Sequence, residues 1–440
     1  FLLSEIPGIT AGNKILESYT WAEALDVNLS FALDGLSLLF AILITGIGVL
    51  IVIYGSSYLS EDKDLPKFYS YLFLFMGAML GVVVSDNIFA LFVFWELTSL
   101  SSYLLIGFRH SYESTRKAAL QALLVTGTGG LALMAGLILI SQLAGSANIS
   151  EWTAGNFTLA KSEKLPLILI FVLLGAFTKS AQFPFHFWLP NAMVAPTPVS
   201  AYLHSATMVK AGVYLVARLN PVMQGSTEWQ SSLVIIGGVT MLMGAVWAIF
   251  QSDLKKMLAY TTVSALGIMI LSIGIGTPAA VQAAMIFMFA HALYKGGLFL
   301  VAGNVTHATG TRDVTLISGL FPEMRFTGMA AILTCLSMAG VPLFIGFLSK
   351  ELLYAAALSS GWLTIFIIPG VFFTGVVFVS LAILLGWRVF LRRNKDFSYE
   401  NVHEVSPGMY SGPLLLGFTG FFSGLFPGLS VESLISGAAF

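Results

Sequence analysis

Apolar residues fill this chain in runs of roughly 20, and polar residues gather in short segments between the runs. A helix of about 20 apolar residues spans the hydrocarbon core of a bilayer. In lipid, every backbone polar group must be satisfied internally, which favours helices of this length. The pattern predicts twelve membrane-spanning helices, at residues 36–58, 69–86, 87–107, 116–142, 165–189, 199–218, 231–250, 254–276, 280–302, 326–348, 362–390 and 411–428.

Composition supports an all-α polytopic fold embedded in a lipid bilayer. Charged residues make up 10% of the 440 residues and hydrophobic residues 57%, whereas soluble domains carry about 25% charged residues. The net charge of −1 gives no indication of a nucleic-acid partner. The single cysteine, Cys335, excludes intrachain disulfides and is expected to pack as a small hydrophobe. Because the chain begins at Phe1, we expect it to be a fragment.

The loops predict an orientation. When successive loops are assigned alternately to two faces, one face collects thirteen of the 21 basic residues. The positive-inside rule places that face in the cytoplasm. The basic residues of this face are Lys63, Lys67, Arg109, Arg116, Lys117, Lys255, Lys256, Arg312, Arg325, Arg388, Arg392, Arg393 and Lys395. The opposite face has Lys14, Lys161, Lys164 and Arg218.

A weak internal symmetry divides the chain. Residues 175–180 carry a lysine followed by Pro184, and residues 340–350 carry a proline followed by a lysine. An odd number of helices per repeat inverts the second copy, and inverted repeats with broken helices are typical of transporters. The predicted regions are a loop at 1–35, a leading helix and loop at 36–68, a five-helix repeat at 69–230, its inverted copy at 231–395, and a loop with the last helix at 396–440.

Four lysines lie inside apolar runs: Lys179, Lys210, Lys295 and Lys350. A charge at the bilayer centre costs at least about 2.5 kcal/mol, so such residues usually serve transport. Glu96 lies near the centre of its predicted helix, at a depth similar to that of Lys179. A cationic neighbour would keep this carboxylate ionised. The alternative interpretation is a structural salt bridge.

Lys179 precedes Pro184, which is expected to break the helix and to free backbone carbonyls near the amine. His186 would share a face with Lys179 if the helix continued, and it is a candidate site where protons enter or leave. Because residues 183–188 are rich in aromatic residues, a lysine that extends to the membrane interface is the alternative.

Two further helices each pair a histidine with a lysine. His204 and Lys210 follow the proline-rich residues 196–198. His291 and Lys295 are four residues apart, so one helix face carries both. Histidine can relay protons. The alternatives are that His204 and His291 only pack, and that Lys295 extends into a polar vestibule.

Lys350 and Glu351 are adjacent and therefore point in different directions from a helix. Lys350 is expected to face the interior, and Glu351 is a candidate exit residue. Asp253, Lys255 and Lys256 begin a helix and are interpreted as a positive-inside anchor, with Lys256 also a candidate port.

Several kinds of chemistry have no motif in this chain. HExxH, GxSxG and GxxxxGK[ST] patterns are absent. The glycine-rich residues 127–132 lie within an apolar run and are interpreted as a helix-packing surface. We therefore expect no cofactor, no metal site and no enzymatic activity, and energy must come from an ion gradient or from partner subunits.

These motifs resemble a known family, the proton-translocating antiporter-like membrane subunits shared by respiratory complex I and multisubunit Mrp sodium/proton antiporters. The resemblance covers nearly the whole chain. Lys210 and residues 310–313 are most similar to the large, A-type branch of the Mrp subunits. The motifs are residues 34–37, 94–97, 178–182, 195–212, 253–260, 291–295 and 347–351.

The resemblance implies that Glu96 and Lys179 form a glutamate–lysine pair and that Lys350 ends the series in the second half. It also implies that His204, His291 and Lys295 extend a hydrated central relay. By the same resemblance, about two helices are missing at the start, and the long C-terminal extension usual for the A-type subunit is absent. The resemblance also implies a bacterial plasma membrane.

The sequence thus predicts a subunit that couples proton movement to sodium efflux within a hetero-oligomer of membrane subunits. The alternative is a proton-pumping subunit of an NADH–quinone oxidoreductase, whose redox chemistry lies in other chains. A third hypothesis is a membrane scaffold whose charges only hold helices together.

Overall fold

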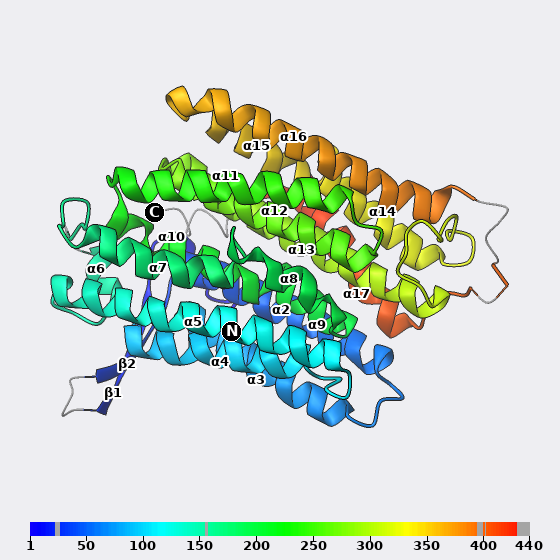
Figure 1. The fold of residues 1–440 in the computed structure, drawn as a ribbon, viewed down its shortest axis with the longest axis horizontal. Helices are drawn as coiled ribbons and strands as arrows, with labels where there is room; N and C mark the ends of the chain where they lie inside the picture. Colours follow the sequence, from blue (N-terminus) through cyan, green and yellow to red (C-terminus); the bar gives the residue numbers. More distant parts are fainter. Residues whose placement is uncertain (23–26, 155–156, 394–398, 401, 429–440) are drawn as a thin grey trace.

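The computed structural model describes residues 1–22, 27–154, 157–393, 399–400 and 402–428. Long helices run side by side along the longest axis of the molecule (Figure 1). The longer helices are α2 (Gly35–Tyr58), α3 (Leu65–Val84), α4 (Ile88–Ile106), α5 (Glu113–Ala144), α7 (Leu165–Lys179), α10 (Ala211–Met223), α11 (Thr227–Ile249), α12 (Leu254–Gly274), α13 (Pro278–Thr309), α14 (Arg325–Ala339), α15 (Ile345–Leu358), α16 (Thr364–Ile383) and α17 (Pro407–Leu425). The short elements are α1 (Ile6–Thr10), α6 (Ile149–Ala154), α8 (Trp188–Asn191), α9 (Thr197–Ala201), β1 (Ile15–Ala22) and β2 (Val27–Leu33).

The predicted membrane helices agree with the structure. Eight described helices are long and apolar enough to cross a membrane, counting α16 together with the π-helical residues 384–391. The predicted spans at 165–189, 199–218 and 326–348 are helices broken into pieces, and the span at 411–428 is α17. The expected all-helical, multi-pass membrane fold is confirmed, with breaks in both halves of the chain.

Helix ends follow from side chains that satisfy the free backbone groups there. The side chains of Asp34, Asn87, Ser226 and Asp253 accept hydrogen bonds from the first turns of α2, α4, α11 and α12. Such caps stabilise a helix by about 1 kcal/mol each. The polar residues between apolar runs therefore fix where each helix begins.

The expectation of a plain loop before the first long helix is wrong. Residues 6–10 form α1, and residues 15–22 and 27–33 form an antiparallel hairpin. β-Branched and aromatic residues in both strands favour this structure. Phe31 of β2 also bridges to Ser85, at the end of α3. The hairpin thus lies at one end of the bundle (Figure 1).

The centre of the bundle is α13. An 18-residue stretch of α13 is completely buried, whereas the corresponding stretches of α5, α11 and α16 are 39% buried. α13 packs against α12, α14, α15 and α17. Groups carried by α13 therefore lie deepest in the protein.

The predicted sorting of loops is consistent with the structure. The ends of α2, α4 and α13 meet around one surface hollow, which Lys63 and Arg109 line. Lys14 and Arg218 lie together near the hairpin, at the opposite end. Lys395 and parts of the predicted C-terminal region lie outside the described residues. That the basic end faces the cytoplasm stays a prediction.

Candidate functional site

The first half of the chain places a lysine at a helix break. α7 ends at Lys179, and Ala181 adopts a left-handed backbone conformation with φ of 48°. The indole nitrogen of the buried Trp188 donates to the carbonyl of Thr178 at 2.9 Å. This bond holds the chain after the break against the end of α7. The predicted break near Pro184 is therefore present and begins at Lys179.

Lys179 is completely buried and is bound to α4. Its Nζ donates to the Ser99 hydroxyl at 2.7 Å and to the Trp95 carbonyl at 3.0 Å. Nζ also lies 5.1 Å from the centre of the Trp95 ring. A lysine that extends to the interface is excluded.

Glu96 lies close enough to Lys179 for electrostatic interaction. No ion pair within 4 Å joins the two described side chains. One Glu96 oxygen, Oε1, is buried without a hydrogen-bond partner among the described residues. The two side chains therefore interact electrostatically without forming a direct ion pair.

Glycines of α5 create the space that Glu96 occupies. A Cβ on Gly130 would collide with Oε1 of Glu96, and one on Gly129 would collide with Thr178 of α7. α5 therefore packs closely on α4 and α7, as the small-residue pattern predicted. A side chain at residue 130 would displace the carboxylate.

His204 lies in a π-helical segment, Tyr202–Ala206, that follows α9. π-Helical turns often mark functional sites. The ring of His204 is fully buried and lies 6.1 Å from that of Trp188. Neither of its nitrogens has a hydrogen-bond partner in the described part of the chain. The imidazole is thus free to accept or donate.

Lys210, His291 and Lys295 form the deepest part of the site. Nζ of Lys210 donates to the Met288 carbonyl at 2.9 Å, and Nζ of Lys295 donates to the Thr261 hydroxyl at 2.6 Å. His291 lies between them, close enough for both amines to act on it electrostatically. Both of its ring nitrogens lack partners among the residues described. The structure brings these three predicted residues together, and Lys295 extends to no vestibule.

The second half of the chain has a break of its own. α14 ends at Ala339, and Gly340 follows in a left-handed conformation with φ of 79°. α15 begins at Ile345 and carries Lys350, whose Nζ donates to the Ala339 carbonyl at 2.7 Å. A Cβ on Gly340 would press on the Lys350 stem. Glu351 is exposed, so the two neighbours face opposite ways as expected.

The remaining candidate residues lie away from these groups. The break separates His186 from the α7 face of Lys179, and its half-buried ring stacks on Phe183 at 6.2 Å. The expectation of a shared face is therefore not met. Lys256 is exposed at the start of α12. These positions leave His186, Lys256 and Glu351 at the edges of the polar interior.

The interpretation of Lys255 as a surface anchor is wrong. Its side chain is 2% exposed, and its Nζ donates to the Ala195 carbonyl at 2.6 Å. That carbonyl directly precedes Pro196, the residue before α9. The signal was present in the sequence, because Asp253 caps α12 and two lysines that follow a cap point in different directions.

Together these residues form the central polar line, whose members are Glu96, Lys179, His204, Lys210, Lys255, His291, Lys295 and Lys350. Four of its lysines, residues 179, 210, 255 and 295, are at most 2% exposed. None of the four has a carboxylate within 4 Å in the described part of the chain. Buried structural charges normally carry partners. Here each ammonium donates hydrogen bonds only to neutral oxygens of the described residues.

A buried ion pair lies at the hairpin end. Arg218 of α10 donates to both carboxylate oxygens of Asp34 and to the Ser37 hydroxyl. Burial alone would raise the pKa of Asp34, but the Arg218 charge and these hydrogen bonds together lower it to about 2. This paired arrangement is what the central polar line lacks.

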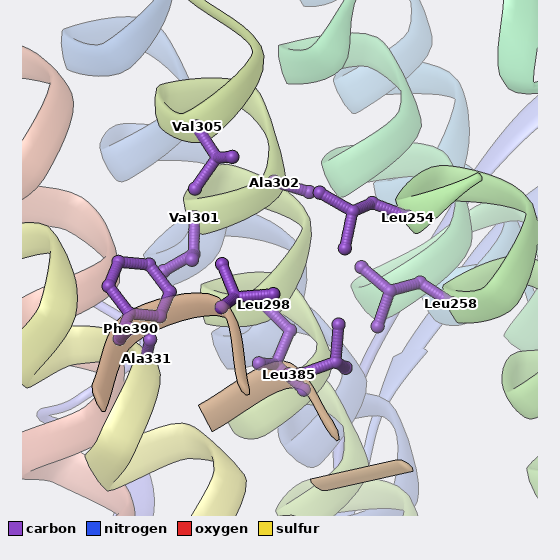
Figure 2. Close-up of a pocket in the computed structure, with 10 residues that line it drawn as sticks. Leu254, Leu258, Leu298, Val301, Ala302, Val305, Ala331, Leu385 and Phe390 are labelled. Atoms are coloured by element: carbon purple, nitrogen blue, oxygen red, sulfur yellow. The ribbon is translucent and has the colours of Figure 1, made fainter. Parts of the chain in front are cut away.

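One pocket inside the bundle is too small and too apolar to be a site for chemistry. Figure 2 shows a pocket between α12, α13 and residues 385–390 that is lined by hydrocarbon side chains. Its volume of about 10 Å³ is too small for more than one water molecule. No group of three or more His, Cys, Asp or Glu side chains that could hold a metal occurs in the described part of the chain. Cys335 is buried, as a small hydrophobe would be.

Broken helices and buried ionisable groups in a multi-pass helical bundle are typical of membrane proteins that transport ions. The chain belongs to the NADH:quinone oxidoreductase/Mrp antiporter family, whose membrane-domain model matches residues 85–377. A second model, the N-terminus of NADH-ubiquinone oxidoreductase (complex I) chain 5, matches residues 20–69.

Curated proteins are similar to this chain over nearly its whole length. The chain is 42% identical, over its whole length, to the A1 subunit of a Na(+)/H(+) antiporter from Staphylococcus haemolyticus and covers 57% of that protein. It is 43% identical over 98% of its length to the corresponding A-type Na(+)/H(+) antiporter protein of Alkalihalophilus pseudofirmus, and covers 56% of it. The chain thus spans about half the length of these relatives.

Solved structures share the fold. One is the Mrp complex of Dietzia sp., with a TM-score of 0.88 and 34% identity, covering all of this chain and 48% of that one. Another is an archaeal respiratory complex, the membrane-bound sulfane sulfur reductase, with a TM-score of 0.86 and 26% identity over 98% of this chain and 71% of that one. Resemblance to the A-type branch of the Mrp subunits is therefore confirmed.

Proposed function

We propose that this chain is the proton-translocating part of a Na⁺/H⁺ antiporter within a multisubunit membrane complex. The observation that carries the proposal is the set of buried lysines without carboxylate partners. A proton on such an amine is hydrogen-bonded only to one or two neutral oxygens, and at Lys179 the nearby Glu96 charge adds to its stabilisation. It can therefore move when a neighbouring group offers a better acceptor. The names of the curated relatives support Na⁺ as the coupled ion.

The geometry supports a path through both halves. Lys179 and Glu96 lie at the first break and Lys350 lies at the second, with His204, Lys210, His291 and Lys295 between them. Imidazoles whose two nitrogens are both free can take a proton on one side and release it on the other. The chain therefore needs no cofactor for its own step, which is ion transport rather than an enzymatic reaction.

Two other functions are less well supported. A scaffold would need its buried charges paired, as Asp34 and Arg218 are, because an unpaired buried charge is destabilising. The likeness to a respiratory complex keeps a redox-driven proton pump as an alternative. Sodium dependence of proton movement separates this alternative from the antiporter. We place the complex in the bacterial plasma membrane, in keeping with its bacterial relatives.

The test is proton flux in vesicles that contain the whole complex. Lys179→Ala should reduce Na⁺-dependent proton exchange to background, because the amine at the first break is lost. Lys117→Ala is the control, since Lys117 is exposed and forms a surface pair with Glu113. Normal assembly together with undiminished exchange in Lys179→Ala would refute the proposal.

A further inference from the structure

A polar hollow lies at the basic end of the bundle, apart from the central polar line. Its volume is about 730 Å³, and it opens between the ends of α2 and α13 and the loop after α4. We call it the α2–α13 basin. Its lining residues are Tyr58, Leu59, Ser60, Glu61, Asp62, Lys63, Arg109 and His307. Water and small buffer ions fit in a hollow of this size.

Three side chains lead inward from the basin with decreasing exposure. His307 of α13 is exposed, Tyr58 of α2 is half-buried, and Thr197 at the start of α9 is 2% exposed. The rings of His307 and Tyr58 lie 6.3 Å apart. The Thr197 hydroxyl donates to the Tyr58 hydroxyl at 3.4 Å. A hydrogen-bonded step thus joins the surface hollow to a buried residue.

Thr197 stands next to the central polar line. Ala195, whose carbonyl accepts from Lys255, lies two residues earlier, which is at most about 7 Å of chain. Arg109, which lines the basin, is among the charged groups whose fields reach Lys255, together with Arg312 and Asp253. The basin and the Lys255 amine therefore lie close to each other, on the two sides of residues 195–197, which lead into α9.

Close packing holds these groups in place. A Cβ on Gly303 of α13 would collide with the Tyr54 hydroxyl and crowd the methyl group of Thr197. Tyr54 in turn stacks on Tyr58, with ring centres 5.5 Å apart. The Tyr58 ring is thus fixed from the α2 side, and Thr197 is fixed from the α13 side.

We propose that the α2–α13 basin is the proton-uptake port of this chain and that His307, Tyr58 and Thr197 carry protons from it to Lys255. This inference rests on the proposed function. Each hydroxyl can donate and accept, so rotation of the two hydroxyls reverses the Thr197–Tyr58 hydrogen bond. Tyr58 then gives its proton to Thr197 as it takes up another from the basin. Thr197 gives its own proton to a bridging water molecule, which hands one to the neutral Lys255 amine. Both hydroxyls thus remain neutral, and the proton ends on Lys255 as an ammonium.

The charges around the basin suit this role. Glu61 and Asp62 attract protons from solution, while Lys63, Arg109 and exposed His307 balance them at the same rim. Lys256, the candidate port in the sequence, is exposed beyond the start of α12 and does not line the basin.

The test measures Na⁺-dependent proton exchange by the whole complex, in vesicles with the basin facing the bath. Tyr58→Phe and Thr197→Val keep the shapes of the side chains and remove the hydroxyls, so each should slow exchange on the order of tenfold. Thr197→Ser should exchange close to the wild-type rate. The control is Tyr69→Phe, because Tyr69 is also half-buried and its hydroxyl donates to the Val52 carbonyl in α2.

A chemical-rescue arm adds a readout that a structural role would not move. His307→Ala should slow exchange, and imidazole in the bath on the basin side should restore it, whereas imidazole on the opposite side should not. Wild-type exchange in both Tyr58→Phe and Thr197→Val, with normal assembly, would overturn the proposal. If Lys179→Ala still abolishes exchange in that case, the proposed function stands and uptake occurs elsewhere. If Lys179→Ala also exchanges normally, the proposed function itself fails.

Discussion

The two helix breaks carry similar lysines in different surroundings. Lys179 ends α7, is completely buried, and is held by a hydroxyl and a carbonyl of α4, with Glu96 close by. Lys350 follows its break, is only partly buried, and is held by the carbonyl of Ala339, which the break itself frees. One lysine is tied to a neighbouring helix, and the other is tied to its own broken helix.

Under the proposed function, this difference predicts different tasks for the two breaks. At the first break, motion of α4 or of Glu96 changes what stabilises the lysine, so the proton on Lys179 responds to its neighbours. At the second break, a cavity of about 20 Å³ beside Lys350 leaves room for roughly one water molecule. The first break is therefore suited to switching, and the second to passing a proton onward.

Replacing Lys350 gives the largest expected effect after Lys179. In Lys350→Ala the terminal amine is lost, and Na⁺-dependent exchange should fall by roughly tenfold to a hundredfold. Some exchange should remain, because the cavity beside Lys350 has room for water. Flux assays on vesicles measure this, and a loss as complete as that of Lys179→Ala would make the two breaks equivalent.

Ser99 tests how α4 holds the first lysine. Ser99→Ala removes the 2.7 Å bond to Lys179, and a hydrogen bond to a charged group is worth about 1.5–3 kcal/mol. We expect exchange to slow by about tenfold and its pH profile to shift. Ser101→Ala is the matched control, because the Ser101 hydroxyl bonds within α4. Equal effects of the two variants would contradict the role of this bond.

Gly130 tests the position of Glu96. Gly130→Ala would push the carboxylate away from α5, and an off-rotamer side chain costs about 0.5–1.5 kcal/mol. Exchange should slow by about threefold with normal assembly. Gly127→Ala is the control, because a Cβ there meets Glu96 at an ordinary 3.7 Å. If Gly127→Ala slowed exchange more than Gly130→Ala, the close packing of Gly130 on Glu96 would not be what positions the carboxylate.

Asp34 provides the smallest expected effect on transport and a clear effect on stability. Asp34→Asn leaves Arg218 buried without its carboxylate, which should cost about 3–5 kcal/mol of folding free energy. A lowered pKa means that the stabilisation is complete above the usual Asp range and is lost only as pH falls towards about 2. Thermal unfolding of the wild-type complex should therefore show no loss from this pair between about pH 4 and 7. A loss in that window would show that the pair is weaker than its geometry indicates.

Much of the fold follows from the sequence alone. The apolar runs located the helices. Pro184 and the residues at 340–342 indicated the breaks, because a proline has no backbone N–H to donate and so interrupts a helix. The hairpin before residue 34 was missed, since a short exposed strand pair carries no long apolar run. The π-helical turn at His204 was missed as well, because no residue type forces an extra residue into a helical turn.

The burial of most candidate residues could be predicted from the sequence, and their contacts less well. Lysines in apolar runs are conspicuous, so Lys179, Lys210 and Lys295 were found. The sequence could not show that Ser99 and Trp95, rather than Glu96, hold Lys179, because that depends on how α4 turns about its own axis. The burial of the lysine at residue 255 was missed because its place beside a helix cap resembled that of an ordinary loop lysine.

The most direct test of the central claim is Na⁺-dependent proton flux in vesicles that hold the complete complex, with wild type compared with Glu96→Gln. The amide keeps the size of the side chain and removes its charge. Our account predicts that exchange falls to near background while the complex assembles normally. Exchange at the wild-type rate in Glu96→Gln would contradict a proton path that depends on this carboxylate beside Lys179.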